Sequence, residues 1–377
     1  MPLSLLCLFC FPLLLTAAAN AQTPGVPSSH LDHLHRGVNI GRFSDKGLEN
    51  DPCCKTKADV AVIQSMGFDH VRIIVKPKSM ADFSKPITAI GGQSLLDLDS
   101  IVQNFVDAKV GVILAITLDS TKDEFPDIKD KLGNDKSTFD DYFGDFWKCF
   151  ASRYSTHSDL VFFETLNEPD LDDTTWSRLQ EKLVTKIRDG AAQNTIIATG
   201  AHGIINGLLG LDPLPDENVI YSFHYYEPYS FTNQGETWAP GYLKLLTKGS
   251  VTYPYQSLDS AQNAATQIKD LTDHLSAMHD MMLATKDRIT NDINEVAKWK
   301  QKNGVTVICD EFGAIITTNL KDRENWTRDV REELEDKNIG MGWTFWDYNS
   351  SNFGLLPLQA GADLVSALGV NPPPAPH

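Results

Sequence analysis

The sequence has few cysteines and a deficit of basic residues. Of its six cysteines in 377 residues, Cys7 and Cys10 lie in an apolar N-terminal run, and the other four contain no C-x-x-C pair that would indicate a zinc ribbon or a redox motif. Lys and Arg number 33 against 50 Asp and Glu, so the formal net charge is −17. Nucleic acids and anionic membranes bind basic patches. We therefore expect neither as a partner, and an uncharged ligand suits the composition.

The four remaining cysteines are too few for a disulfide framework in a chain of this size. Cys53 and Cys54 are adjacent, so we expect at most one bridge from this pair, to Cys149 or Cys309. Cys309 lies in the apolar run VTVICDEF and is expected to be a buried thiol.

Long apolar runs are also scarce, and the one that stands out is N-terminal. It extends from Leu3 to Leu15 and is followed by Ala19-Asn20-Ala21, an A-x-A cleavage pattern. The run is shorter than the roughly 20 residues that a membrane-spanning helix needs. Residues 1–21 are thus predicted to be a signal peptide, and the protein to be secreted, extracellular or periplasmic, with no membrane attachment after signal removal. We expect a monomer.

The segments at the two ends of the predicted mature chain look irregular. Residues 22–35 (QTPGVPSSHLDHLH) are rich in Pro, Ser and His, and we expect a flexible lead-in. Its histidines lie beside no cysteine and few carboxylates, so no metal site is predicted there, and no cofactor is expected elsewhere. Residues 371–377 (NPPPAPH) are expected to form a tail.

Between these ends, residues 36–370 alternate short apolar runs with helical patterns. The apolar runs are continuous rather than alternating, which is typical of parallel strands covered on both faces. Eight such strands with helices between them predict a single (β/α)₈ TIM barrel as the catalytic domain. A long aromatic segment, 227–256, follows the sixth strand, and a helical stretch over 259–302 is expected to divide in two. The predicted strands span 37–41, 69–75, 110–118, 160–166, 195–199, 218–225, 305–310 and 340–345.

Polar residues interrupt these strands at one end. In a barrel the carboxyl ends of the strands meet at one mouth, where active sites are built. Two acids, Glu168 and Glu311, follow the fourth and seventh strands, and paired carboxylates across a cleft suit glycosidic bond cleavage. Arg72 and Tyr226 are the expected hydrogen-bond donors to the nucleophile, whereas Glu164 precedes the mouth and is assigned a structural role.

The motifs RGVN, MGFDHVRI, LNEP, HYY and DEFG, followed by a tryptophan near the eighth strand, occur in this order between Arg36 and Asn352. This pattern resembles glycoside hydrolase family 5, the cellulase-like (β/α)₈ retaining β-glycanases. The resemblance implies a double displacement with Glu168 as acid/base and Glu311 as nucleophile. It also implies supporting roles for the residues Arg72, Asn167, His224 and Tyr226, and a sugar platform at Trp346, with Trp343 as the alternative.

One departure from the family is visible. The family usually has a histidine after the third strand, and this chain has ITLDSTKDEF there, with Asp119 and Ser120 nearest the expected place. Further substrate-binding candidates are Asn39, Phe43 and Trp238, the last because it lies in the long aromatic segment.

We expect an exported retaining endo-β-1,4-glucanase acting on β-glucan or a related neutral polysaccharide. A β-mannanase or β-1,3-glucanase remains open, because loops set the specificity. From other classes, a catalytically silent polysaccharide-binding barrel and a metal hydrolase remain alternatives. The retained glutamates argue against the first, and the shortage of His and Asp ligands at the strand ends argues against the second.

Overall fold

The structure is a computed structural model that describes residues 25–44, 46–48, 54, 56–118, 132–133, 138–239, 241–356 and 363–374. The predicted signal peptide, and the Asp119–Ser120 position where the family histidine is missing, lie outside these residues. Within them, no helix combines the length and the apolar composition that crossing a membrane would require.

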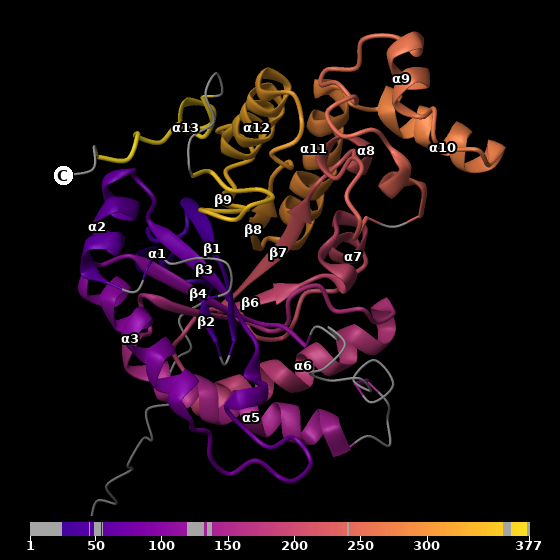
Figure 1. The fold of residues 1–377 in the computed structure, drawn as a ribbon. Coiled ribbons are helices and arrows are strands. Elements are labelled where there is room, and N and C mark those ends of the chain that lie inside the picture. The colour runs from indigo at the N-terminus through magenta and orange to yellow at the C-terminus, as the bar shows by residue number, and fades with distance from the viewer. Residues whose placement is uncertain are drawn as a thin grey trace, which may run out of the picture.

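Eight parallel strands close into a barrel in the described part of the chain (Figure 1). Each strand pairs with its neighbour in chain order, and β1 also pairs with β9, which closes the ring. The predicted (β/α)₈ TIM barrel is confirmed. One short strand, β2 (Gly47–Leu48), is additional and pairs antiparallel with β1. The barrel strands are β1 (Arg36–Ser44), β3 (His70–Val75), β4 (Gly111–Ile116), β5 (Val161–Glu164), β6 (Ile196–Thr199), β7 (Val219–Tyr225), β8 (Thr306–Phe312) and β9 (Gly342–Phe345).

Helices surround the strands in Figure 1, and polar caps fix where several of them begin. The Thr56 side chain accepts a hydrogen bond from the Asp59 backbone and Asp59 reciprocates, so α2 starts in a capping box. The longer helices are α2 (Lys57–Ser65), α3 (Gln93–Asp107), α5 (Thr138–Tyr154), α6 (Asp173–Gly190), α10 (Leu271–Met282), α11 (Lys286–Asn303) and α12 (Leu320–Glu335). The shorter α-helices are α1 (Ser28–Leu31), α7 (Ile205–Leu209), α8 (Tyr229–Thr232), α9 (Leu258–Ala264) and α13 (Leu364–Ala367).

The stretch expected to divide into two helices divides into three. Ser257, Asp270 and Thr285 each cap a new helix through a side-chain oxygen, so α9, α10 and α11 begin separately. In Figure 1, α9 and α10 extend away from the barrel, while α11 lies against it.

The barrel interior is apolar at the amino ends of the strands and polar in the middle. The apolar layer is a separate cluster formed by Leu34, Ile113, Phe162, Ile197, Ile220 and Ile308. Inward-facing positions recur every second residue along a strand. The next inward positions on β5, β7 and β8 are therefore Glu164, Ser222 and Asp310, all fully buried.

Residues 25–35 are not the flexible lead-in that we expected. Val26 and Leu31 pack on the apolar layer just described, and Leu34 is part of it. The buried His30 ring also forms a hydrogen bond of 2.7 Å to the hydroxyl of Thr195. These apolar side chains were hidden among Pro, Ser and His in the sequence, and they close the amino end of the barrel. At the other end of the chain, Asn371 is held by a backbone hydrogen bond to Met66.

Strand β8 contains a one-residue bulge next to the predicted site. Cys309 pairs with Phe223 of β7 and Glu311 pairs with the next residue, His224, so Asp310 is the extra residue. A shift at the same place occurs against β9. A bulge breaks the strict alternation of side chains, which lets Asp310 and Glu311 both approach the barrel interior.

The structure has no bridge from Cys54 to Cys149 or Cys309, the pairing that the sequence allowed. Cys54 is disulfide-bonded, but Cys149 and Cys309 are both free thiols. Cys309 is fully buried on β8, as expected from its apolar surroundings.

Candidate active site

Glu168 lies just beyond the carboxyl end of β5, at the mouth of the barrel. Its backbone φ is 44°, a left-handed conformation that is unfavourable for a residue with a side chain and is often found at functional sites. Its side chain is 42% exposed, and one carboxylate oxygen lies 2.9 Å from His224 Nδ1. Gly203 passes so close that a Cβ there would lie 3.0 Å from Glu168 Cγ.

Glu311 is held on the opposite side by two donors. Arg72 Nη1 donates to one oxygen at 2.6 Å, and the Tyr226 hydroxyl donates to the other at 2.9 Å. The residue is only 5% exposed. Both oxygens of this buried carboxylate are thus occupied by hydrogen-bond donors, which fixes its orientation.

Arg72 is the centre of this network. Its side chain is fully buried, and its five N–H groups are matched by five hydrogen bonds. Nε and Nη2 donate to the two oxygens of Glu164, and Nη1 donates to Glu311. The remaining bonds go to the side-chain oxygens of Asn39 and Asn167, at 3.0 and 2.8 Å. Asn39 and Glu164 are themselves fully buried, so both position Arg72, and the structure does not support the predicted substrate contact from Asn39.

His224 connects the two glutamates. Its Nδ1 is 2.9 Å from Glu168 and 3.5 Å from Glu311. Burial alone would lower the pKa of His224, but the charges of Glu311 and Asp310 and the hydrogen bond to Glu168 raise it to about 9. Burial acts to raise the pKa of Glu168, yet the hydrogen bond and positive charge of His224 outweigh it, so that this pKa is lowered. In the ligand-free site the proton between His224 and Glu168 therefore lies on His224 Nδ1.

The two carboxylates are close together. One oxygen of Glu168, a ring nitrogen of His224 and one oxygen of Glu311 all lie within 4.8 Å of one another. Glu168 is open to the mouth and Glu311 is enclosed and donor-bound, so the two acids have different environments. Such a pair can supply one group to transfer protons and one to attack an electrophilic carbon.

The candidate aromatic residues fall in different places. Trp346 is half-buried and packs with Tyr226 and Phe353, on the side of Glu311. Trp343 is fully buried, with its indole N–H on Glu335, so it offers no face to a sugar. Phe43 is also fully buried, and the structure contradicts its predicted role in substrate stacking, because the ring packs in the hydrophobic core outside the barrel.

Trp238 is 51% exposed in the segment between β7 and α11. Within the described residues it shares no hydrogen bond or ring contact with the two glutamates. The structure therefore leaves its predicted sugar contact without geometric support.

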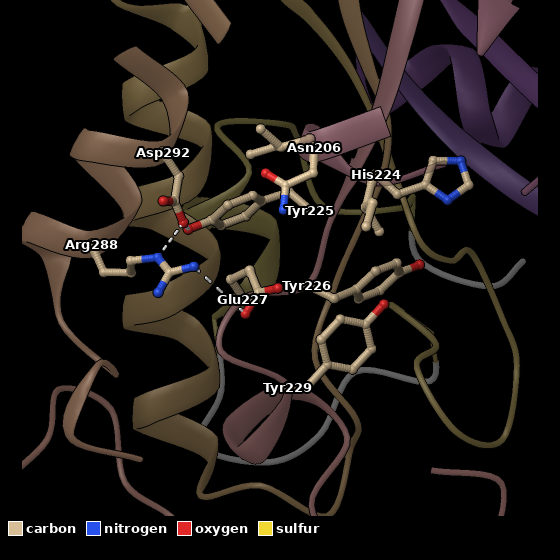
Figure 2. A pocket seen from close by; sticks show the side chains of 10 residues that line it. Asn206, His224, Tyr225, Tyr226, Glu227, Tyr229, Arg288 and Asp292 are labelled. Carbon is tan, nitrogen blue, oxygen red and sulfur yellow. Dashed lines mark hydrogen bonds and ion pairs between the residues drawn. The ribbon is translucent and has the colours of Figure 1, made fainter. Parts of the chain in front are cut away.

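A small cavity of about 90 Å³ lies beside the site, behind the end of β7 (Figure 2). Arg288 lines it and pairs with Asp292 at 2.5 Å and with Glu227 at 4.0 Å. Burial and the charge of Asp280 raise the pKa of Glu227 to about 7, although Arg288 opposes this. Tyr226 and Tyr229, whose rings are 6.2 Å apart, line the same cavity, and so does His224 of the catalytic network.

Two triads in the described residues contain ligand atoms close enough for a metal ion. They are Glu164, His224 and Asp310, and Glu168, His224 and Glu311. A divalent cation in either would compete with Arg72, which already compensates Glu164 and Glu311. Arg72 therefore accounts for Glu164 and Glu311, and the donor set does not favour a metal.

Sequence reasoning missed two residues of this site: Gly203 and Asp310. Asp310 was visible as an acid inside an apolar strand, directly before Glu311, which is the signal that could have identified it. Nothing in the local sequence distinguishes Gly203 from a loop glycine, because its constraint is the nearby Glu168 side chain.

Comparison with known proteins agrees with this geometry. The family model described as cellulase (glycosyl hydrolase family 5) matches residues 32–352. The chain therefore belongs to glycosyl hydrolase family 5 and is an endoglucanase-like glycoside hydrolase.

Relatives include Endoglucanase 3 of Fibrobacter succinogenes, which is 27% identical over 94% of this chain, although the chain spans only 55% of that protein's length. Endoglucanase C of Acetivibrio thermocellus is 24% identical, with 84% of this chain and 92% of that protein covered. Among solved structures, the endoglucanase Cel5A of Thermotoga maritima is 26% identical with a TM-score of 0.70, covering 91% of this chain and 99% of that one.

Proposed function

We propose that the protein is an exported, retaining endo-β-1,4-glucanase that cleaves internal linkages of a plant-type β-glucan by double displacement. The observation that carries retention is the separation of the two acids. Carboxyl groups lie roughly 5–5.5 Å apart in retaining enzymes and about 6.5–9.5 Å apart in inverting ones, which must admit a water between them. Oxygens of Glu168 and Glu311 within 4.8 Å support the first arrangement.

In the first step Glu311 attacks the anomeric carbon while Glu168 gives its proton to the departing glycosidic oxygen. Arg72 and Tyr226 hold Glu311 in place for this attack. In the second step Glu168 takes a proton from water, and the water cleaves the glycosyl ester of Glu311. Trp346 borders the nucleophile side and is the proposed platform for the sugar ring there.

Export rests on the apolar run and A-x-A pattern of residues 1–21. It is tested by sequencing the N-terminus of the protein recovered from culture medium or periplasm. We expect Gln22 as the first residue, and retention of the intact N-terminus in the cytoplasm would contradict export.

A β-mannan is the second candidate substrate. A solved structure of Thermotoga maritima Cel5A, 26% identical to this chain with a TM-score of 0.71, is described as a complex with mannotriose. A panel of carboxymethylcellulose, mixed-linkage β-glucan, laminarin, mannan and xylan, with product sizing, separates the two. We expect the highest kcat/KM on β-1,4-glucan. Endo action should shorten the average length of the polysaccharide rapidly, and release of only short end products would contradict it.

The catalytic roles are tested by Glu168→Gln and Glu311→Gln on unactivated polysaccharide, with the exposed Glu217→Gln as the control. The first two should lose at least about 100-fold in kcat, because each removes a group that acts in the transition state. With an activated aryl glycoside and azide, Glu311→Gly should give an inverted glycosyl azide and Glu168→Gly a retained one. The opposite stereochemistry would exchange the two roles.

A further inference from the structure

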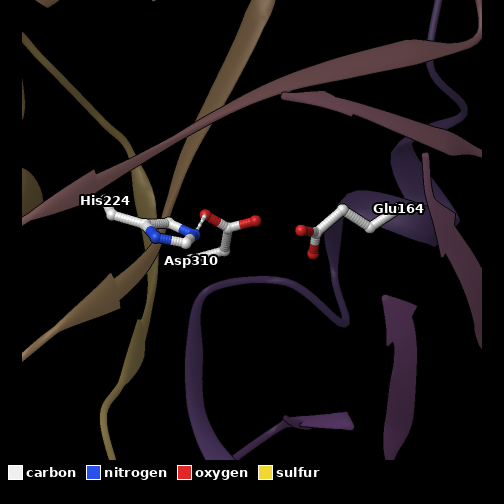
Figure 3. Close-up of side chains that lie close together, drawn as sticks. All are labelled: Glu164, His224 and Asp310. Carbon is white, nitrogen blue, oxygen red and sulfur yellow. Dashed lines mark ion pairs between the residues drawn. The ribbon is translucent and has the colours of Figure 1, made fainter. Parts of the chain in front are cut away.

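Asp310 lies directly before the proposed nucleophile and faces His224 from the inside of the barrel. Its side chain is fully buried, and Oδ1 lies 3.4 Å from His224 Nε2 (Figure 3). Within the described residues, neither carboxylate oxygen of Asp310 has a hydrogen bond. His224 Nε2 has none either. A buried carboxyl without a hydrogen bond is unfavourable, so this position requires an explanation.

Among the charged groups that the structure describes around Asp310, His224 is the one that remains available as a donor. Glu164 on β5 faces it but is bound at both oxygens by Arg72. Arg72 on β3 lies 3.8 Å from Asp310 Oδ2, yet all five of its N–H groups are used elsewhere. Glu311, the next residue on β8, contributes only a further negative charge. The contact through which Asp310 can share a hydrogen with a charged neighbour is therefore the 3.4 Å approach of Oδ1 to His224 Nε2.

Asp310, His224 and Glu168 thus form a line of three titratable side chains with His224 in the middle. Glu168 Oε1 is 2.9 Å from Nδ1 on one side of the imidazole, and Asp310 Oδ1 is 3.4 Å from Nε2 on the other. Two protons can occupy this line in different ways at constant total charge. In one arrangement Asp310 is protonated and Nδ1–H donates to the Glu168 carboxylate. In the other, Nε2–H donates to the Asp310 carboxylate, and Nδ1 accepts from protonated Glu168.

We propose that Asp310 is a positioning residue that exchanges one proton with Glu168 through His224, and so provides Glu168 with the proton that it needs as the acid. This proposal rests on the proposed function, in which Glu168 is the acid/base. In the exchange, the O–H bond of Asp310 breaks as the N–H bond at Nε2 forms. The N–H bond at Nδ1 breaks as the O–H bond of Glu168 forms, and no other reactant is consumed.

The ionisation of the free site agrees with this exchange. Burial and the charge of Glu164 raise the pKa of Asp310 to about 8, although Arg72 and His224 act in the opposite direction. Asp310 can therefore hold a proton at neutral pH, where an ordinary aspartate would not. The proton remains inside the barrel, separated from Glu168 by the imidazole ring of His224, instead of passing into solvent.

The test is Asp310→Asn, which keeps the size of the side chain but has no proton to exchange. The basic limb of the kcat/KM profile on cello-oligosaccharides should move to lower pH by about one unit, because the variant lacks the buried carboxyl that retains the exchangeable proton above neutral pH. On this substrate, kcat/KM at pH 7 should fall by about 10- to 100-fold. With an aryl glycoside whose leaving group needs no proton, the loss should be less than about threefold.

Ser222→Ala is the matched control, because Ser222 is equally buried in the same layer of the barrel and its hydroxyl donates to Thr199, outside the catalytic network. It should leave the pH profile unchanged, and also the ratio of kcat/KM on the cello-oligosaccharide to kcat/KM on the aryl glycoside. If Asp310→Asn does not fold, as judged by circular dichroism, Asp310→Ser replaces it with the same expectations. A wild-type pH profile together with equal losses on both substrates would overturn the proposal.

This outcome is distinguishable from a failure of the proposed function. If wild-type protein cleaves the glycan and Glu168→Gln does not, but Asp310→Asn behaves as wild type, only the Asp310 role is lost. If Glu168→Gln retains full activity on unactivated glycan, the acid/base assignment fails first, and the role of Asp310 fails with it.

Discussion

Arg72 holds Glu164 in a two-point ion pair, with Nε 2.6 Å from one carboxylate oxygen and Nη2 2.7 Å from the other. Both side chains are fully buried. The planar guanidinium is thereby fixed in orientation, and its remaining nitrogen Nη1 is aimed at Glu311. The position of the proposed nucleophile thus depends on a residue that has no access to substrate.

Glu164→Gln is therefore expected to affect both stability and activity. Removing one charge of a buried pair leaves the other poorly compensated, and we expect a loss of about 3 kcal/mol in the free energy of unfolding. Urea denaturation measures this. The exposed Glu217→Gln should change stability by less than about 0.5 kcal/mol. An unchanged unfolding midpoint in Glu164→Gln would mean that Arg72 is held by its other partners.

Gly203→Ala should reduce activity more than stability. Gly203 has a φ of 69°, and a Cβ there would lie 3.0 Å from Glu168 Cγ and 3.1 Å from His224 Nδ1. The methyl group would displace the proposed acid/base, for which we expect a loss of about 10- to 100-fold in kcat. The backbone conformation alone should cost about 1 kcal/mol.

Gly304 provides the matched control for this variant. It has a φ of 65° at the end of α11, and a Cβ there meets nothing within 4 Å. Gly304→Ala should show a similar loss of stability with wild-type kcat. Equal activities in the two alanine variants would contradict the close approach of Gly203 to Glu168.

Glu227→Gln should change how stability depends on pH. The pKa of Glu227 is raised from its ordinary value of 4.5 to about 7, first by burial and then by the charge of Asp280. The folded protein therefore binds the proton more tightly than the unfolded chain, and this contribution to stability is lost as pH rises from 4.5 through 7. The side chain is 34% exposed, so solvent screening limits the effect to about 1–2 kcal/mol.

Thermal unfolding at pH 5 and pH 8 measures this difference. The stability of Glu227→Gln minus that of wild type should be more positive at pH 8 than at pH 5. Glu217→Gln should follow the wild-type pH dependence. A parallel shift at both pH values would argue that Glu227 is not protonated preferentially in the folded state.

Leu34→Ala tests the closure of the amino end of the barrel. Leu34 is 5% exposed and packs on the apolar layer with Phe162 and Ile308. We expect a loss of about 2–4 kcal/mol in the free energy of unfolding. Leu271→Ala makes the same chemical change at a side chain that is 69% exposed, and it should have almost no effect. Similar midpoints for the two variants would show that residues 25–35 contribute little to stability.

The strands and the two glutamates could be predicted because their signals are local. Continuous apolar runs mark buried parallel strands, and a carboxylate at the end of such a run is visible without any pairing information. The bulge at Asp310 is not local, because it exists only relative to Phe223 and His224 on the next strand. Periodicity in one strand cannot reveal it.

The predictions for Phe43 and residues 25–35 failed for a related reason. Phe43 is an aromatic residue close to the RGVN motif and was a substrate-binding candidate, but its ring turns to the helix-covered outside of the barrel. Residues 25–35 have a polar composition, yet three apolar side chains among them meet the open end of the barrel. The composition of a short segment does not indicate which surface the segment packs against.

The closed amino end has a practical consequence for handling the protein. Residues 25–35 pack on the first inward layer of the strands, whereas Glu168 and Glu311 lie at the strands' carboxyl ends. A tether or fusion partner joined before residue 25 is therefore attached at the pole opposite the catalytic mouth. On a solid support, such attachment would present the mouth outward, where a long polymer chain can reach it.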